Sequence, residues 1–249
     1  MRRFLPIIIM LVALGATSAD VSAWPANTPP SVELRISGGN QGLSLPVQIF
    51  LLLTVLTFLP AILMSMTSFA RILVIMHFLR QAVGLQSVPS NQILIGLSLL
   101  LTLFIMQPVG EKVNDQALQP LIEGKIGYQE AFNAAIGPLR DFMIKQTREK
   151  DIMLFLEISK QPRPKVPADL STQVLAPAFM ISELKTAFQI GFLMFLPFLV
   201  IDLVVSSILL AMGMMQLPPI VISTPFKILL FVMVDGWNLV VSSIVKSFF

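Results

Sequence analysis

The sequence predicts an all-α, integral-membrane-like protein with two hydrophobic helical hairpins and a polar helical insert. The first observation is the composition: of 249 residues, 55% are hydrophobic and 12% charged, and the mean hydropathy is +0.82. An average soluble domain has roughly twice that charged fraction. The second is that the apolar residues form four hydrophobic segments of helical length, and the third is that most charges lie between the second and third segments. The chain is therefore a membrane protein, or it buries similar surface in a large assembly.

Residues 1–23 have the pattern of a secretory signal peptide. Two arginines precede an apolar core of about eleven residues, which is too short to span a bilayer. Small residues follow, so cleavage is expected after Ala19 or Ala23; an uncleaved first anchor is the alternative. Residues 24–44 are rich in Pro, Gly, Ser and Asn, which predicts an extended N-terminal tail.

The first hydrophobic hairpin is predicted at residues 45–110. Its first arm, Leu45–Leu79, would measure about 52 Å as one helix, which is too long for one perpendicular span. Pro60 and the Ser- and Thr-containing patch after it predict a kink, or a helix that runs beyond the bilayer. A turn leads to the second arm, 92–106, which we expect to end near Pro108.

Residues 111–187 differ in kind, because about two thirds of the chain's charged residues lie there. Apolar residues recur at spacings of three and four over Tyr128–Lys160, which predicts an amphipathic helix. Three prolines in 161–169 break that helix. The segment therefore reads as a polar helical insert followed by a linker.

The second hydrophobic hairpin is predicted at residues 188–249. Two apolar runs, Ala187–Leu210 and Ile220–Val245, flank a turn at 211–219 that is rich in Met and Pro and carries no charge. Pro197 is expected to kink the first run. The uncharged turn fits a loop that enters lipid or packs on a neighbouring subunit. It also fits a deformable constriction repeated around a ring, because methionine fills irregular gaps.

The topology follows from the exported N-terminus that a signal peptide implies. The turn with Arg80 then lies on the cytoplasmic side, as the positive-inside rule prefers. The charged insert is expected to be periplasmic, and the methionine turn to face the cytoplasm.

Charged residues within the apolar runs need partners, since a charge at the bilayer centre costs about 2.5–3.5 kcal/mol on insertion scales. Lys227 needs an acid, which Glu183 or Asp202 can supply within the hairpin or from the next subunit. We favour a static structural pair over a proton path, because a relay requires several carboxylates or histidines in file. The role of Asp235 stays open.

Catalysis, metal binding and nucleic-acid binding find no support. The chain has no cysteine and a single histidine, His77, and it lacks the glycine-rich phosphate loop and the common hydrolase motifs. Its net charge of +3 is small and the basic residues are dispersed. We expect a protein that is not an enzyme and holds no cofactor.

Two blocks of sequence resemble the FliP family of flagellar export-gate proteins and their injectisome homologues. The first is PAFMISELKTAFQIGF at residues 177–192. The second combines Pro218-Pro219, Pro225–Ile228 and Val234–Trp237. The signal peptide, a segment at 68–72 and the polar insert occur in the same order, so the resemblance covers essentially the whole chain. The signal peptide favours the flagellar branch.

The resemblance implies that the chain is the core pore-forming subunit of the flagellar type III protein export gate. It would conduct unfolded flagellar substrates across the bacterial inner membrane, and it would lie at the flagellar basal body. Members form a helical ring of about five copies, completed by a FliR-type subunit and surrounded by FliQ-type subunits, with other export-apparatus membrane proteins nearby. Their apolar hairpins largely pack on one another above the membrane plane. The alternatives are a small four-span ion or solute transporter and a purely structural membrane scaffold.

The resemblance also implies roles for individual residues. Met214, Met215 and Gln216 match a methionine-rich gasket that narrows the pore, with Gln216 where a third methionine is common, so the seal is smaller or wetter. Charged subunit contacts are expected from Glu183, Lys227 and Arg148. Phe142 and Phe155 are expected to be insert contacts that help the ring assemble.

Overall fold

A computed structural model of the chain describes residues 45–249 except 86, 165, 167–168 and 215. The predicted signal peptide and extended tail, and Met215 of the predicted gasket, therefore lie outside the described residues. The chain forms two units, residues 1–50 and 51–249. The described residues of the first unit are helical, and the second unit holds the features discussed below.

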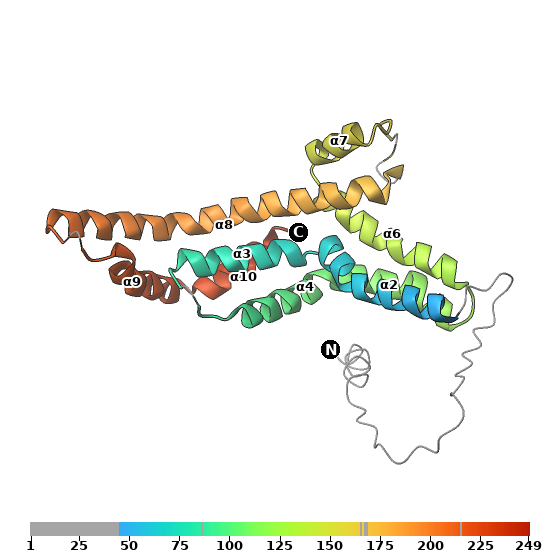
Figure 1. Ribbon diagram of the computed structural model, residues 1–249, viewed down its shortest axis with the longest axis horizontal. Coiled ribbons are helices and arrows are strands. Elements are labelled where there is room, and N and C mark those ends of the chain that lie inside the picture. The colour runs from blue at the N-terminus through green and yellow to red at the C-terminus, as the bar shows by residue number, and fades with distance from the viewer. Residues whose placement is uncertain (1–44, 86, 165, 167–168, 215) are drawn as a thin grey trace, which may run out of the picture. The chain divides into compact units, whose positions relative to one another are not determined.

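Every regular element in the described residues is a helix, as Figure 1 shows, so the all-α prediction is confirmed. In chain order they are α2 (Leu45–Met66), α3 (Phe69–Ala82), α4 (Asn91–Val113), the π-helical η1 (Asn114–Leu118), α5 (Gln119–Ile122), α6 (Tyr128–Gln146), α7 (Glu149–Ile158), α8 (Thr172–Ala211), α9 (Pro219–Met233) and α10 (Gly236–Lys246). Two stretches, Asn91–Ile122 and Thr172–Ala211, are long and apolar enough to cross a membrane. The pair α9 and α10 passes the same test together, but it is bent by 67°.

The helix breaks in the first hairpin match those expected only in part. The backbone of α2 stays helical through position 60, and the break comes between Met66 and Phe69, in the predicted Ser- and Thr-containing patch. The second arm does not end near Pro108: α4 runs on to Val113, and helical backbone continues to Ile122. A proline removes one helical hydrogen bond, and the packing of α4 and η1 against α6 offsets that loss.

The predicted amphipathic helix of the insert is two helices. Thr147 and Arg148 are extended, with ψ values of 131° and 141°, and they separate α6 from α7. The Arg148 backbone N–H donates to the Ser182 hydroxyl on α8 at 3.0 Å instead of to a helical carbonyl. This partner lies 34 residues away, so local spacing could not reveal it.

The third apolar run is part of a longer helix than expected. α8 has 40 residues and continues without a break through Pro177 and Pro197, so the block at 177–192 and the apolar run after it share one helix. The division of the chain into domains stays a prediction; the boundaries drawn at 110/111 and 187/188 both fall inside helices.

The fourth apolar run is not one helix, because the chain bends between α9 and α10. Asp235 adopts the left-handed conformation, with φ 51° and ψ 55°, which asparagine and aspartate tolerate better than most residues. A Cβ added to Gly236 would lie 2.2 Å from the Phe231 ring, so the ring can pack there only against a glycine. The bend thus depends on the sequence Asp-Gly and on one aromatic ring.

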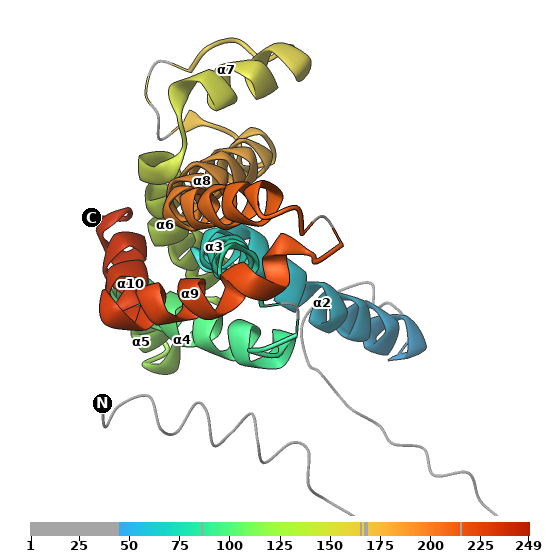
Figure 2. The ribbon, with the colours of Figure 1, turned by 90° about the vertical axis from the view of Figure 1, so that its left-hand side faces the viewer.

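Helix α3 lies at the centre of the packing, between α8 on one side and α4 on the other (Figures 1 and 2). The main buried cluster joins α3 to α4, α8, α9 and α10. Fully buried aliphatic side chains of this cluster include Ile72, Ile75 and Met76 of α3 and Ile244 of α10. A core of this kind fixes α3 and α8 side by side and so positions the polar groups that they bury.

Helix α8 contacts the Phe78 side chain of α3 closely at Gly191. A Cβ added there would lie 2.7 Å from Cδ2 and 3.0 Å from Cβ of Phe78. The Phe78 ring cannot turn away freely, because it packs edge-on against Phe188 with 5.3 Å between ring centroids. The glycine therefore sets the distance between the two helices.

We expect Gly191→Ala to lower the free energy of unfolding by about 1–2 kcal/mol, since overpacking costs more than the helix propensity that alanine adds. Unfolding in detergent micelles measures this change. Gly96→Ala in α4 is the matched control, because nothing lies within 4 Å of a Cβ built there; it should be neutral or stabilising. Equal stabilisation by both substitutions would contradict the packing argument.

Candidate functional site: a buried charge network and the methionine turn

Arg71 of α3 and Glu183 of α8 form an ion pair in the interior of the second unit. Their side chains are 2% and 0% exposed. The Arg71 Nε donates to Glu183 Oε2 at 2.9 Å, and Nη2 donates to Oε1, so the pair is bidentate. Such a pair replaces lost hydration only when its geometry is good and its other donors are satisfied.

The remaining donors of Arg71 are satisfied by the insert and by the C-terminal residues. Nη1 donates to the Ser247 carbonyl at 2.9 Å and to its hydroxyl at 3.1 Å, and Nη2 donates to Gln146 Oε1 at 3.1 Å. The guanidinium carbon lies 3.8 Å from the centroid of the Phe248 ring, a cation–π contact. Gln146 in turn donates to the Phe248 carbonyl at 3.0 Å. One side chain thus ties together α3, α6, α8 and the end of the chain.

The predicted insert contact Phe142 belongs to the same region. Its half-buried ring packs edge-on against Phe179 and stacks on Phe248, with centroid distances of 5.9 and 6.3 Å. Phe155, on α7, packs instead against a separate buried cluster of Leu156, Leu170 and Val174. Both aromatic residues therefore contribute to packing within the chain, and their subunit contacts stay a prediction.

Arg148 lies two residues after Gln146, outside the network around Arg71. Its Nη2 pairs with Asp151 Oδ2 at 2.6 Å, and the neighbouring Ser182 hydroxyl donates to the same carboxylate oxygen. The Arg148 side chain is 32% exposed, and its buried Nε has no hydrogen-bond partner among the described residues. The other two predicted charged contacts, Glu183 and Lys227, have side chains that are almost completely buried.

Lys227 of α9 pairs with Asp202 of α8, so the structure decides between the two acids considered for it. The Lys227 Nζ donates to Asp202 Oδ2 at 2.6 Å, and the Ser223 hydroxyl donates to Oδ1, also at 2.6 Å. Lys227 is 2% exposed and Asp202 34%. These bonds join the two arms of the second hairpin near its turn.

The methionine turn begins where α8 ends. Gly213 has a φ of +71°, and the N–H groups of Gly213 and Met214 donate to the carbonyls of Leu210 and Leu209, a common way to end a helix. Pro219 then opens α9, where a proline costs no helical bond. Met214 and Gln216 are exposed, and so are most described residues of the turn.

Arg71 is not among the site residues predicted from the sequence, although it is the only Asp, Glu, Lys or Arg in the first apolar arm, Leu45–Leu79. That isolation is the signal that could have found it, because a lone charge in an apolar helix needs a buried partner. Among the described residues, no group of three His, Asp or Glu side chains is placed to hold a metal ion. His77 contacts the Leu73 carbonyl of its own helix through Nδ1 at 3.1 Å.

We expect Arg71→Met and Glu183→Met each to lower the free energy of unfolding by about 3–5 kcal/mol, since each leaves an uncompensated buried charge. The double variant should lose less than the sum of the singles, with a coupling of about 1–3 kcal/mol. Detergent unfolding of the four proteins measures the cycle, and exposed Lys150→Ala is the control. Additive losses would show that the pair contributes nothing as a pair.

Comparison with known proteins shows which family the chain resembles. The FliP family profile matches residues 52–244. The flagellar biosynthetic protein FliP of Bacillus subtilis (strain 168) is 51% identical over 217 residues, which cover 87% of this chain and 98% of the relative. The proteins of the same name from Pectobacterium carotovorum subsp. carotovorum and Aquifex aeolicus (strain VF5) are each 48% identical, over 96% and 88% of this chain and 92% of each relative. The chain therefore belongs to the FliP family.

Proposed function

We propose that the chain is a component of the flagellar export apparatus and, within it, the core pore-forming subunit of the type III export gate. In this role it conducts unfolded flagellar proteins across the bacterial inner membrane and catalyses no reaction. Relatives that are half identical over nearly their whole length carry the name flagellar biosynthetic protein FliP. The apolar helices of membrane-spanning length support a membrane location.

The observation that carries the pore assignment is the exposed, uncharged turn at the end of the second hairpin. The Asp202–Lys227 pair fixes the two arms just behind the turn, while Met214 and Gln216 remain exposed. Several copies around an axis would bring their turns together as a soft seal, formed by Met214, Met215 and Gln216. A seal of this kind can yield to a passing chain and close behind it.

The extent of exposed apolar surface supports a multi-subunit assembly. Large hydrophobic side chains are exposed along α4, α8 and α9, and surface of this size marks contact with lipid or protein. We propose a homo-oligomer of about five copies with FliR-type and FliQ-type subunits and other export-apparatus membrane proteins. Part of the apolar surface is then covered by subunits rather than by lipid.

The predicted subunit contacts take two forms in this proposal. Arg148 is exposed enough to reach a neighbour directly. Glu183 and Lys227 are buried within the chain, so they act on the assembly by fixing the positions of α8 and α9. Loss of Glu183 would then impair ring assembly more than conduction.

The native mass of the detergent-extracted protein tests the assembly. We expect rings near five copies that grow when a FliR-type partner is co-expressed. A monomer or dimer under all conditions would contradict the gate and favour the small transporter. The transporter would depend on protonation of Asp202 or Asp235, and of these two carboxylates Asp202 is bonded to Lys227 and Ser223.

A leak measurement tests the seal. We expect the double substitution Met214→Ala and Met215→Ala to raise the passage of ions or small solutes through the assembled gate, because alanine cannot fill the gap that methionine fills. Gln216→Met should lower the leak below that of the natural chain. Met64→Ala, the same truncation of an exposed methionine on α2, away from the turn, should leave the leak unchanged. An unchanged leak in the double variant, with rings intact, would refute the seal.

A further inference from the structure

Two charged side chains in α3, α8, α9 and the bend before α10 have neither a hydrogen bond nor an ion pair among the described residues. Arg71 pairs with Glu183, and Lys227 pairs with Asp202. Arg80 donates to two neutral acceptors, Asn91 Oδ1 at 2.7 Å and the Pro89 carbonyl at 3.2 Å. The two charges left over in α3, α8, α9 and the bend before α10 are Lys185 and Asp235.

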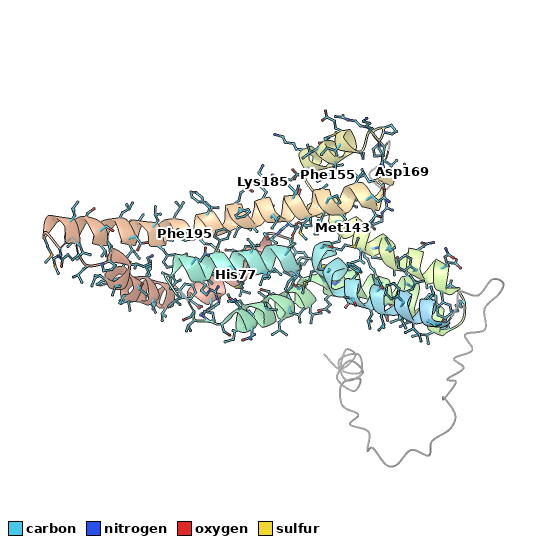
Figure 3. All side chains as sticks on the ribbon, viewed as in Figure 1. His77, Met143, Phe155, Asp169, Lys185 and Phe195 are labelled. Atoms are coloured by element: carbon cyan, nitrogen blue, oxygen red, sulfur yellow. The ribbon has the colours of Figure 1, made fainter. Side chains whose placement is uncertain are left out.

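Lys185 lies on an apolar groove. It is exposed on α8, on the side away from α3 (Figure 3), and no described side chain forms a hydrogen bond or ion pair with its ammonium group. The groove is shallow and open, and all its lining residues belong to α8. It is lined, besides Lys185, by Ile181, Leu184, Phe188, Gln189 and Phe192. Ile181, Phe188 and Phe192 are exposed, so this wall has no cover within the chain.

Asp235 lies on a projecting bend with apolar neighbours. Its exposed side chain makes no capping hydrogen bond to α10, so the carboxylate has no described partner. Met233, Val234 and Trp237 beside it are all exposed, Met233 by 75%.

The two features are complementary in charge and in form. One is a cation in an apolar groove, and the other is an anion on an apolar projection. Each charge would be costly alone in lipid or at an apolar interface, and each offers what the other lacks. Lys185 and Asp235 are not paired with each other within the chain. An ion pair between them would therefore join two copies.

We propose that Asp235 of one copy binds Lys185 of the next, with the bend between α9 and α10 seated in the α8 groove. The inference rests on the proposed homo-oligomeric gate and names one of its contacts. Because the two surfaces differ, the contact is heterologous, and repetition closes a ring or extends a helical array. Met233 and Trp237 would cover the exposed groove residues while the ion pair fixes the register.

Site-directed cross-linking tests the contact, and the chain suits it because it contains no cysteine. A lysine–aspartate pair holds its Cβ atoms too far apart for a disulfide, so the reagent is a short bis-methanethiosulfonate. Chains carrying both Lys185→Cys and Asp235→Cys should give a ladder of covalent oligomers. Lys185→Cys chains mixed with Asp235→Cys chains should give dimers and nothing larger.

Rival cations provide the controls. Asp235→Cys is paired in the same way with Arg80→Cys and with Lys246→Cys, whose lysine is also exposed. Stronger cross-linking to either position than to 185 would overturn the proposal. If rings of native mass form but no cross-link between positions 185 and 235 appears, the proposed contact is wrong and the proposed gate still stands. If the natural chain forms no rings, the proposed gate itself is refuted.

A charge cycle gives an independent readout. Asp235→Asn removes the charge but keeps a residue that tolerates the left-handed backbone, so the bend should persist. Asp235→Asn and Lys185→Gln should each weaken association of the rings about tenfold, and the double variant should be no weaker than either single. If the losses of association in the two single variants multiply in the double variant, or if neither single variant loses association, the two groups do not contact each other.

Discussion

The structure depends on the buried bidentate pair between Arg71 and Glu183. An isolated guanidinium or carboxylate in that position would be severely destabilising, and the pair is tolerable only when the other N–H groups find acceptors. Those acceptors come from Gln146 in the insert and Ser247 near the end of the chain. Both hairpins and the insert must therefore be in place together before the interior is satisfied, so the pair specifies one arrangement of otherwise similar apolar helices.

Hydropathy and periodicity predicted the helices and some of their ends, such as the turn between Ala211 and Pro219, but not every break. A proline reads locally as a breaker, yet α4 and α8 continue through Pro108, Pro177 and Pro197 because neighbouring helices hold them. Conversely, the break at Thr147 and Arg148 depends on a hydroxyl 34 residues away. The bend at Asp235 depends on a ring that lies against Gly236. Such determinants are tertiary contacts, which no window of local sequence contains.

In the candidate site, too, local sequence does not reveal which residues meet in the folded chain. The sequence identified Lys227, Glu183 and Asp202 as charges in need of partners, but partner choice depends on how the helices are rotated about their axes. The structure joins Lys227 to Asp202 and leaves Glu183 to Arg71. The roles of Arg148, Phe142 and Phe155 at subunit contacts, and of the methionine turn, came from resemblance. A single chain shows only that Arg148 and the described turn residues are exposed.

The second hairpin combines a fixed base with an uncharged tip, and this division suits a seal. The bonds among Asp202, Ser223 and Lys227 join the arms, so the arms cannot separate without breaking an ion pair whose lysine is buried. Beyond them the turn has no ion pair among its described residues, and unbranched methionine chains can rearrange at little cost. In the proposed ring, the rigid support would place the tips at a constant radius, and the soft tips would adapt to a passing chain. Both properties are needed, since a soft base would leak and a charged tip would hold water.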